Sequence, residues 1–318
     1  MEENTEQRVD LTLFSEKIQE LKDRIASVIV GQEQTVDLVL TAILANGHVL
    51  IEGVPGVAKT LLARLTARLI DADFSRVQFT PDLMPSDVLG TTVFNMKTNG
   101  FDFHQGPIFA DIVLVDEINR APAKTQAALF EVMEERQISI DGTTHRMGDL
   151  YTILATQNPV EQEGTYKLPE AQLDRFLMKI TMDYPSLEEE VNILERHHTN
   201  AALVKLDDIT PAITKEELLS LRAFMNQVFV DRTLLQYIAL IVQQTRTSKA
   251  VYLGASPRAS VAMLQSSKAY ALLQGRDFVT PEDIKFVAPY VLQHRLILTA
   301  EAEMEGYSPV KVTQRLIL

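Results

Sequence analysis

A short segment of this chain carries the residue types that bind phosphate groups. Residues 53–60 read GVPGVAKT, with Ala58 standing where the pattern G-x-x-x-x-G-K-[ST] has its last glycine. In such a loop, backbone N–H groups point at phosphate oxygens, and the following helix directs its positive end toward them. Lys59 would reach the β- and γ-phosphates, and the Thr60 hydroxyl would bind Mg²⁺. The segment therefore predicts a nucleotide site.

Because Ala58 replaces the last glycine of the pattern, phosphate binding by the loop depends on the backbone conformation at this position. Alanine is allowed in right-handed helical geometry, so the loop keeps its shape if φ at this position is negative. We therefore expect a negative φ at Ala58, with its N–H directed at the β-phosphate.

Two acids follow a run of apolar residues at 112–117, which reads IVLVDE. A parallel strand delivers side chains at its carboxyl end to the ligand crevice, and neighbouring side chains point in opposite directions. Asp116 would hold the Mg²⁺ shell, and Glu117 would orient and deprotonate an attacking water. A strand that simply ends in solvated acids is the alternative.

Three further polar residues are candidates for contact with phosphate. Asn158 follows another apolar run and would position the water or the γ-phosphate, although Asn before Pro is also a common turn residue. Arg175 stands just before an apolar strand. Arg258 follows Ser256-Pro257 in a first helical turn, where a cation opposes the helix dipole by roughly 0.3–1 kcal/mol. A neighbouring anion would offset that cost, so Arg258 is a candidate phosphate contact supplied by a second domain. A solvated or salt-bridged arginine is the alternative.

Other kinds of site find little support. The six histidines form no H-E-x-x-H pair, and His197 and His198 are expected on a solvated helix face. The chain has no cysteine, which excludes disulfides, thiolate metal sites and a cysteine nucleophile. No serine sits in a G-x-S-x-G turn.

The elements that position these residues alternate in the first half of the chain. Apolar strand-like runs are expected at 48–52, 76–79, 112–115, 151–156 and 176–182, with helices at 11–27, 33–45, 59–70 and 124–135. Strands that are apolar on both faces and alternate with helices predict a mainly parallel α/β sheet covered on two sides. Asn-Gly at 99–100 and Asp-Gly at 141–142 predict two hairpins, at 91–103 and 137–143.

After Pro185 the pattern becomes helical. Ser186 with Glu189 and Thr214 with Glu217 have capping-box spacing, and Ser256 and Thr280 each precede a proline. We therefore predict an α/β domain at 1–185 and a small all-helical domain at 186–318.

Composition bounds the class of protein. The chain has 318 residues, of which 46% are hydrophobic, and a net charge of −13. The excess of acidic residues argues against general nucleic-acid binding, which needs a basic surface. Residues 1–10 do not read as a signal peptide, and no apolar run approaches the roughly 18 residues of a spanning helix. A cytoplasmic protein without membrane insertion is expected.

From about Lys17 to the C-terminus, the chain resembles the MoxR family of AAA+ ATPases. The resemblance rests on GVPGVAKT, LVDEINRAPAKTQAALFEVMEE, ATQNP, EGTYKLPEAQLDRF and SPRA. It implies a five-stranded, mainly parallel sheet between helices, followed by an all-α lid. It also implies a helix-2 insert at about 80–106 and a pre-sensor-1 hairpin at about 136–147, both directed toward a central pore.

The resemblance assigns roles to matching positions. Asp116 and Glu117 match the second nucleotide motif, Asn158 the first sensor, Arg175 an arginine finger that reaches a neighbouring subunit, and Arg258 the second sensor on the lid. The resemblance implies that the segment Val30, Gly31 and Gln32 passes the adenine. The other implied nucleotide-binding residues are Gly53, Val54, Pro55, Gly56, Val57, Ala58, Lys59, Thr60, Leu61 and Asp116. Of these, Thr60 and Asp116 would also bind the metal.

The function that the resemblance implies is hydrolysis of ATP with Mg²⁺ in a homo-hexameric ring. Such proteins act as chaperones that remodel or activate partners, often proteins with a von Willebrand factor A-type domain, or assist cofactor insertion. Two alternatives remain open: a nucleotide-gated scaffold in which ATP binding is the functional step, and a DNA-remodelling AAA+ protein.

Overall fold

The computed structural model describes residues 11–159, 165–199 and 206–317. Its centre is a five-stranded sheet with the strand order β2-β5-β8-β1-β9, and every neighbouring pair in it is parallel. The strands are β1 (Val49–Gly53), β2 (Phe74–Gln78), β5 (Ile112–Asp116), β8 (Thr152–Gln157) and β9 (Met178–Met182). The predicted parallel sheet is therefore confirmed. The expected N-terminal segment 1–10, and residues 163–164 of one quoted motif, lie outside the described residues.

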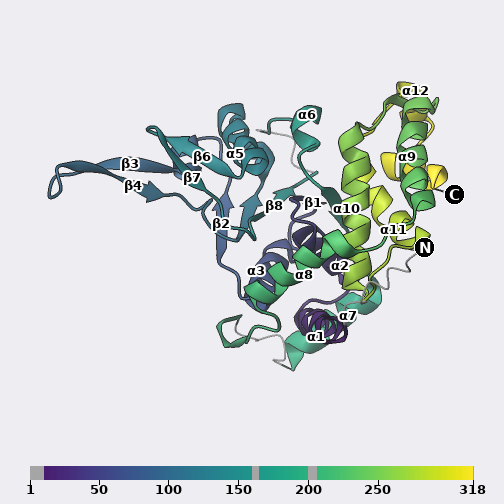
Figure 1. The fold of residues 1–318 in the computed structure, drawn as a ribbon, viewed down its shortest axis with the longest axis horizontal. Coiled ribbons are helices and arrows are strands. Elements are labelled where there is room, and N and C mark those ends of the chain that lie inside the picture. Colours follow the sequence, from purple (N-terminus) through teal and green to yellow (C-terminus); the bar gives the residue numbers. More distant parts are fainter. Residues whose placement is uncertain (1–10, 160–164, 200–205, 318) are drawn as a thin grey trace, which may run out of the picture.

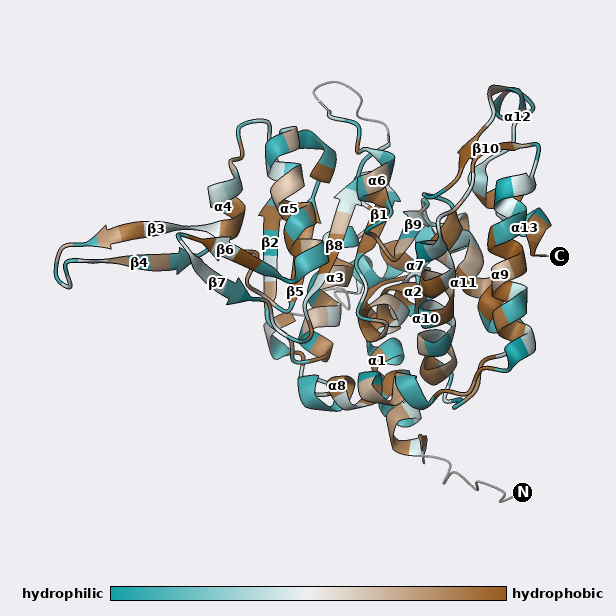
Figure 2. Ribbon diagram, turned by 45° about the horizontal axis from the view of Figure 1, so that its top comes forward, coloured by the Kyte–Doolittle hydropathy of each residue, from teal (hydrophilic) through white to brown (hydrophobic). Residues whose placement is uncertain are grey.

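Helices cover both faces of the sheet because alternate strand residues are buried on opposite sides. Val49 and Ile51 belong to a buried cluster with the three N-terminal helices, whereas Leu50 packs in a second cluster with the helix after β5. These helices are α1 (Thr12–Val28), α2 (Glu33–Leu44), α3 (Lys59–Leu69) and α5 (Ala123–Glu135); the shorter helices are α4 (Pro85–Leu89), α6 (Glu170–Leu173) and a 3₁₀ turn at Ile118–Arg120. Figure 2 shows α2 as predominantly hydrophobic, in keeping with its burial.

The C-terminal region is helical apart from one short ribbon. It contains α7 (Leu187–His198), α8 (Lys215–Phe224), α9 (Arg232–Thr247), α10 (Pro257–Leu273), α11 (Pro281–Leu292), α12 (Ala300–Met304) and α13 (Pro309–Leu316), 3₁₀ turns at Leu206–Asp208 and Met225–Gln227, and an antiparallel pairing of β10 (Val251–Leu253) with β11 (Ile297–Leu298). The predicted capping boxes at Ser186 and Thr214 are both present.

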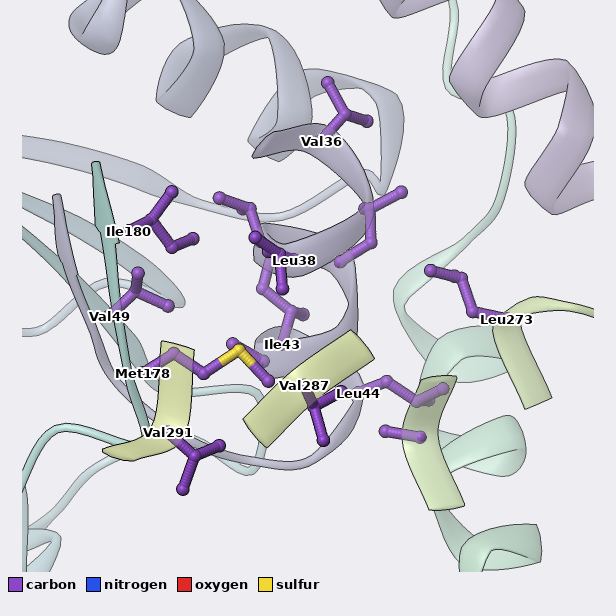
Figure 3. Close-up of a cluster of buried hydrophobic side chains, with 14 of the residues drawn as sticks. Val36, Leu38, Ile43, Leu44, Val49, Met178, Ile180, Leu273, Val287 and Val291 are labelled. Atoms are coloured by element: carbon purple, nitrogen blue, oxygen red, sulfur yellow. The ribbon is translucent and has the colours of Figure 1, made fainter. Parts of the chain in front are cut away.

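This helical region shares a core with the sheet. In Figure 3, Val49 and Ile180 of the sheet and Leu38 of α2 lie in one buried cluster with Val287 and Val291 of α11. This continuous apolar core packs α10 and α11 against the α/β layer, so a displacement of these helices also displaces the side chains of the layer that they contact.

Two hairpins leave the α/β layer at the predicted turns. β3 (Gly90–Asn95) pairs with β4 (Gly100–Gln105), and β6 (Gln137–Ile140) pairs with β7 (Thr143–Arg146), both antiparallel. At the second turn Asp141 and Gly142 have φ of 50° and 78°, as a two-residue hairpin turn requires. The β3–β4 hairpin projects well beyond the body of the protein (Figure 1).

No helix in the described part of the chain is long and apolar enough to cross a membrane.

Candidate functional site

The phosphate-loop segment joins β1 to α3, in the context that the sequence predicts. The Lys59 ammonium donates hydrogen bonds to the carbonyl oxygens of Gly53 and Val54, so the lysine lies across the loop. Partial burial lowers the pKa of Lys59, while the carboxylates of Asp116 and Glu117 raise it. The electrostatic coupling of this lysine to both acids shows that the loop and the end of β5 meet at one place.

The expectation for Ala58 is wrong. Its φ is 62° and its ψ 22°, which is left-handed helical geometry, and Gly56 also has a positive φ, 89°. The chain must reverse sharply before α3 begins at Lys59, and this path needs a left-handed residue at the helix N-cap. Alanine pays about 1–2 kcal/mol there because its Cβ approaches the following carbonyl. The expected direction of the Ala58 N–H toward a phosphate stays a prediction.

Ala58→Gly is therefore expected to stabilise the protein, by about 1 kcal/mol, because glycine adopts φ near 60° without strain. Urea unfolding followed by circular dichroism measures the change. Ala63→Gly, the same chemical change at a buried position inside α3, is the matched control and should destabilise by about 1 kcal/mol or more. Loss of stability in Ala58→Gly would contradict the left-handed geometry.

The buried carboxylate of Asp116 is held on both oxygens. Its Oδ2 accepts a hydrogen bond from Arg76 Nε at 2.6 Å, and its Oδ1 accepts one from Thr156 Oγ1 at 3.1 Å. Arg76 lies on β2, the strand beside β5, and Thr156 lies on β8, the strand on the other side of β5. Sequence reasoning missed both partners, and only the strand order brings them together.

Glu117 departs from the geometry that the sequence predicts. Strand β5 ends at Asp116, and Glu117 has φ 56° and ψ 50°, so strand alternation does not set its direction. Its backbone N–H donates to Thr156 Oγ1 at 3.0 Å, and its Oε2 lies 3.1 Å from Arg120 Nη1. Left-handed backbone at a non-glycine residue costs of order 1–3 kcal/mol and concentrates at functional sites.

Asn158 is buried one residue beyond the end of β8. Because β8 lies between β1 and β5 in a parallel sheet, its carboxyl end opens at the same edge as the loop and the two acids. The structure thus gathers the loop, Asp116, Glu117 and Asn158 at one edge.

A cavity of about 250 Å³ adjoins this edge. It is lined by Val28, Ile29, Val30 and Gln32 around the α1–α2 connection, by Gly56, Val57 and Ala58 of the loop, by Leu61 of α3, and by Pro185, Ile193, Arg196 and His197. Its walls are largely apolar, and the loop forms one end. An apolar slot beside a phosphate loop fits a planar base with a phosphate chain.

Two details of the cavity refine the sequence reading. Gly31 has φ 72°, a backbone conformation that glycine adopts without strain, and it lies against the carboxylate of Glu189 on α7. His197 was expected on a solvated helix face. It is exposed, yet it lines the cavity, because α7 closes over the α1–α2 connection and Arg196 donates to the Ser27 carbonyl at 2.7 Å.

The two candidate arginines lie together, apart from this group. Arg175 Nη1 is 2.9 Å from Glu134 Oε2, and Arg258 Nη2 is 2.9 Å from Glu134 Oε1. The salt-bridged reading of Arg258 is thus present in the structure, and the same carboxylate also holds Arg175.

Strand register places this arginine pair at the far edge of the sheet. In the β1–β9 pairing Val49 is opposite Met178 and Gly53 is opposite Met182, so the segment before β9 lies at the amino end of β1. His48 Nε2 lies 3.2 Å from the carbonyl oxygen of Met133, which puts the end of α5 at that edge as well. At 3.3 Å per residue, β1 alone separates the two edges by about 13 Å. The arginines therefore lie at the edge of the sheet opposite the loop of their own chain.

Comparison with known proteins identifies the family and the two domains. Residues 48–178 match the family described as ATPase family associated with various cellular activities (AAA), and residues 243–316 match the AAA lid domain. The chain is 47% identical to YeaC of Bacillus subtilis over 93% of this chain and 91% of that protein. It is 44% identical to Chaperone MoxR1 of Mycobacterium tuberculosis over 92% of this chain and 79% of that protein. Protein MoxR of Methylorubrum extorquens is 30% identical over 92% of this chain and 91% of that protein.

A solved structure has the same fold. A crystal structure from Cytophaga hutchinsonii covers 97% of this chain and 95% of its own, with a TM-score of 0.88 and 40% sequence identity. The AAA domain, the lid and the five-stranded sheet therefore occur together in relatives as they do here.

Proposed function

This chain belongs to the MoxR family of AAA+ ATPases, and on that premise we propose that it hydrolyses Mg²⁺-ATP in a ring of identical subunits and uses the cycle to remodel partner proteins. One observation carries the proposal. The groups that would bind and activate a nucleotide gather at one edge of the sheet, while the two arginines that would stabilise the transferring phosphoryl group lie at the other. A complete site then needs two subunits.

The residues at the loop fit a magnesium ion. Mg²⁺ is held by one or two oxygen ligands of the protein together with substrate phosphates and water. The Thr60 hydroxyl and the Asp116 carboxylate offer such oxygens, and Asp116 is buried and fixed in orientation by Thr156. Bound there by Thr60 and Asp116, the ion would supply positive charge that neutralises the phosphates of the nucleotide.

The side chains around the γ-phosphate position suggest how water is activated. Glu117 would accept the proton of the attacking water, with Arg120 holding its carboxylate in place. Asn158, buried at the end of β8, would orient that water. Lys59 would bind the phosphates, and the cavity between residues 28–32 and α7 would take the adenine.

The catalytic arginines would come from the adjacent subunit. Arg175 and Arg258 share one carboxylate, so a neighbouring chain would meet them as a pair. Positive charge aimed at developing negative charge on the phosphoryl oxygens is the largest protein contribution in this chemistry.

The proposed partner is a protein, in keeping with the relative named Chaperone MoxR1. The β3–β4 hairpin carries exposed apolar side chains, with Met96 89% and Phe101 73% exposed. Among residues 90–105, the charges of Lys97 and Asp102 cancel. The hairpin therefore offers apolar contacts rather than the positive charge that binds DNA. The proposed partner is a protein with a von Willebrand factor A-type domain or one that needs a cofactor inserted. The proposed ring has six subunits.

Dependence on assembly tests the shared site. Specific ATPase activity is expected to rise with protein concentration until the ring is complete, because a lone subunit has no neighbour whose Arg175 and Arg258 reach its nucleotide. Activity at a series of dilutions, compared with the mass measured by light scattering, gives the answer. Specific activity that stays constant while the protein becomes monomeric would contradict a site shared between subunits.

A further inference from the structure

We infer that Glu134 is a positioning residue that holds Arg175 and Arg258 as one unit, directed at the nucleotide of a neighbouring subunit. The inference rests on the proposed function, in which both arginines act across the subunit interface. It assigns a role to a helix residue that binds neither nucleotide nor metal.

The geometry of the carboxylate is the first step. Each oxygen of Glu134 takes one arginine: Oε2 is 2.9 Å from Arg175 Nη1 and Oε1 is 2.9 Å from Arg258 Nη2. Arg175 Nη1 also donates to the carbonyl oxygen of Phe130, one turn earlier on α5, at 3.2 Å. The last two turns of α5 thereby fix one end of the Arg175 guanidinium.

Charge is the second step. Two guanidinium groups side by side repel each other, and a carboxylate between them removes that cost. Each guanidinium carries five N–H donors, and the contacts to Glu134 use only one Nη of each. The cluster keeps a net charge of one positive unit, and the arginine side chains are 30% and 58% exposed. A phosphate group can therefore be bound from outside while Glu134 holds the pair.

Connection to the lid is the third step. The three charged residues come from α5, from the segment before β9 and from the first turn of α10. The same segment is tied to the helical region a second time, because Asp174 accepts hydrogen bonds from Ser256 Oγ at 3.2 Å and from Arg295 Nε at 2.6 Å. A lid movement that carries α10 would therefore carry the arginine pair with it.

Glu134→Gln is the direct test of this role. The amide keeps the shape of the side chain but removes its charge, so the two arginines lose their common anchor. We expect kcat to fall by roughly 10- to 100-fold, the scale of a misplacement of about 1 Å in an oriented site, with ATP affinity unchanged. Glu135→Gln, at the exposed neighbouring residue of α5, is the matched control and should keep wild-type turnover.

Non-additivity separates positioning from a general loss of structure. If Glu134 acts through the arginines, adding Glu134→Gln to Arg175→Ala should lower kcat far less than it does in the wild-type chain. A full additional loss would overturn the inference, and so would a Glu134→Gln variant that hydrolyses ATP faster than wild type.

Mixed rings locate the defect. Lys59→Ala subunits bind ATP poorly but still present Glu134 and both arginines. Mixed with Glu134→Gln subunits, they should restore ATPase activity well above the sum of the two separate variants. Arg175→Ala mixed with Lys59→Ala is the reference. If the reference mixture recovers activity and the Glu134→Gln mixture does not, the inference fails while the shared site stands. If neither recovers, the shared site itself fails.

Discussion

Arg175→Ala is expected to slow ATP hydrolysis by roughly 10³- to 10⁵-fold, the contribution of an arginine finger in related phosphoryl-transfer enzymes, while ATP affinity stays nearly unchanged. The reason is positional. Arg175 lies at the amino end of β9, at the edge of the sheet opposite the loop that would bind the nucleotide of its own chain. In the proposed ring, removing it would take away an interaction made only with a neighbour's transition state, which would lower kcat rather than binding.

Steady-state phosphate release measures the loss, and titration with a fluorescent ATP analogue measures affinity. Arg24→Ala is a suitable control, because Arg24 also forms an ion pair, with Glu20 at 2.5 Å, but on α1. It should leave both quantities near wild type. An Arg175→Ala variant whose ATP affinity falls in step with its turnover would place Arg175 in its own subunit's site and contradict the register argument.

The sheet was predictable from sequence because its strands are buried on both faces. A parallel strand covered by helices must be apolar at consecutive positions, and Ile112, Val113, Leu114 and Val115 are all buried. Helix starts were predictable for a local reason, since the capping boxes at Ser186 and Thr214 need only residues three apart. The chemistry at the carboxyl edge followed from the same rule, because acids after an apolar strand open into the ligand crevice.

Ala58 was not predictable in the same way. Alanine is compatible with right-handed geometry and pays only a modest cost in left-handed geometry, so its identity does not decide φ. The path of the chain from β1 into α3 decides it, and that path is a property of the whole loop. The left-handed backbone at Glu117 has the same origin, at the point where β5 gives way to the 3₁₀ turn.

Partners distant in sequence were also out of reach. Arg76 is 40 residues from Asp116, and Arg258 is 124 residues from Glu134. The first contact depends on β2 lying beside β5, and the second on α10 lying beside the end of α5. A single sequence marks each residue as a charged side chain but does not state which opposite charge it meets. From the sequence alone Arg258 was therefore open between a phosphate contact and a salt bridge, and only the packing of α10 beside α5 shows the salt bridge.

Glu117→Gln is expected to lower turnover by at least about 10²- to 10⁴-fold, the usual contribution of a general base, and to leave ATP binding intact. Glutamine has the size of glutamate but cannot take a proton from water. Lys59 and the cavity residues stay in place, so the variant should accumulate bound ATP, measured as nucleotide retained through gel filtration. Lys59→Ala is the opposite control, since it should retain little ATP.

The same variant separates an ATPase that needs turnover from a scaffold that needs only ATP binding. In the shared-site reading, hydrolysis releases the arginines of the neighbouring subunit, and Asp174 and Glu134 pass that release to α10 and the lid. A ring that never hydrolyses should then hold its partner without remodelling it. Partner protein captured by Glu117→Gln in ATP, but not by Lys59→Ala, would identify what is held. If the Glu117→Gln ring still matured that partner at the wild-type rate, ATP binding alone would be the working step, because no proton transfer at residue 117 would be needed to move the lid.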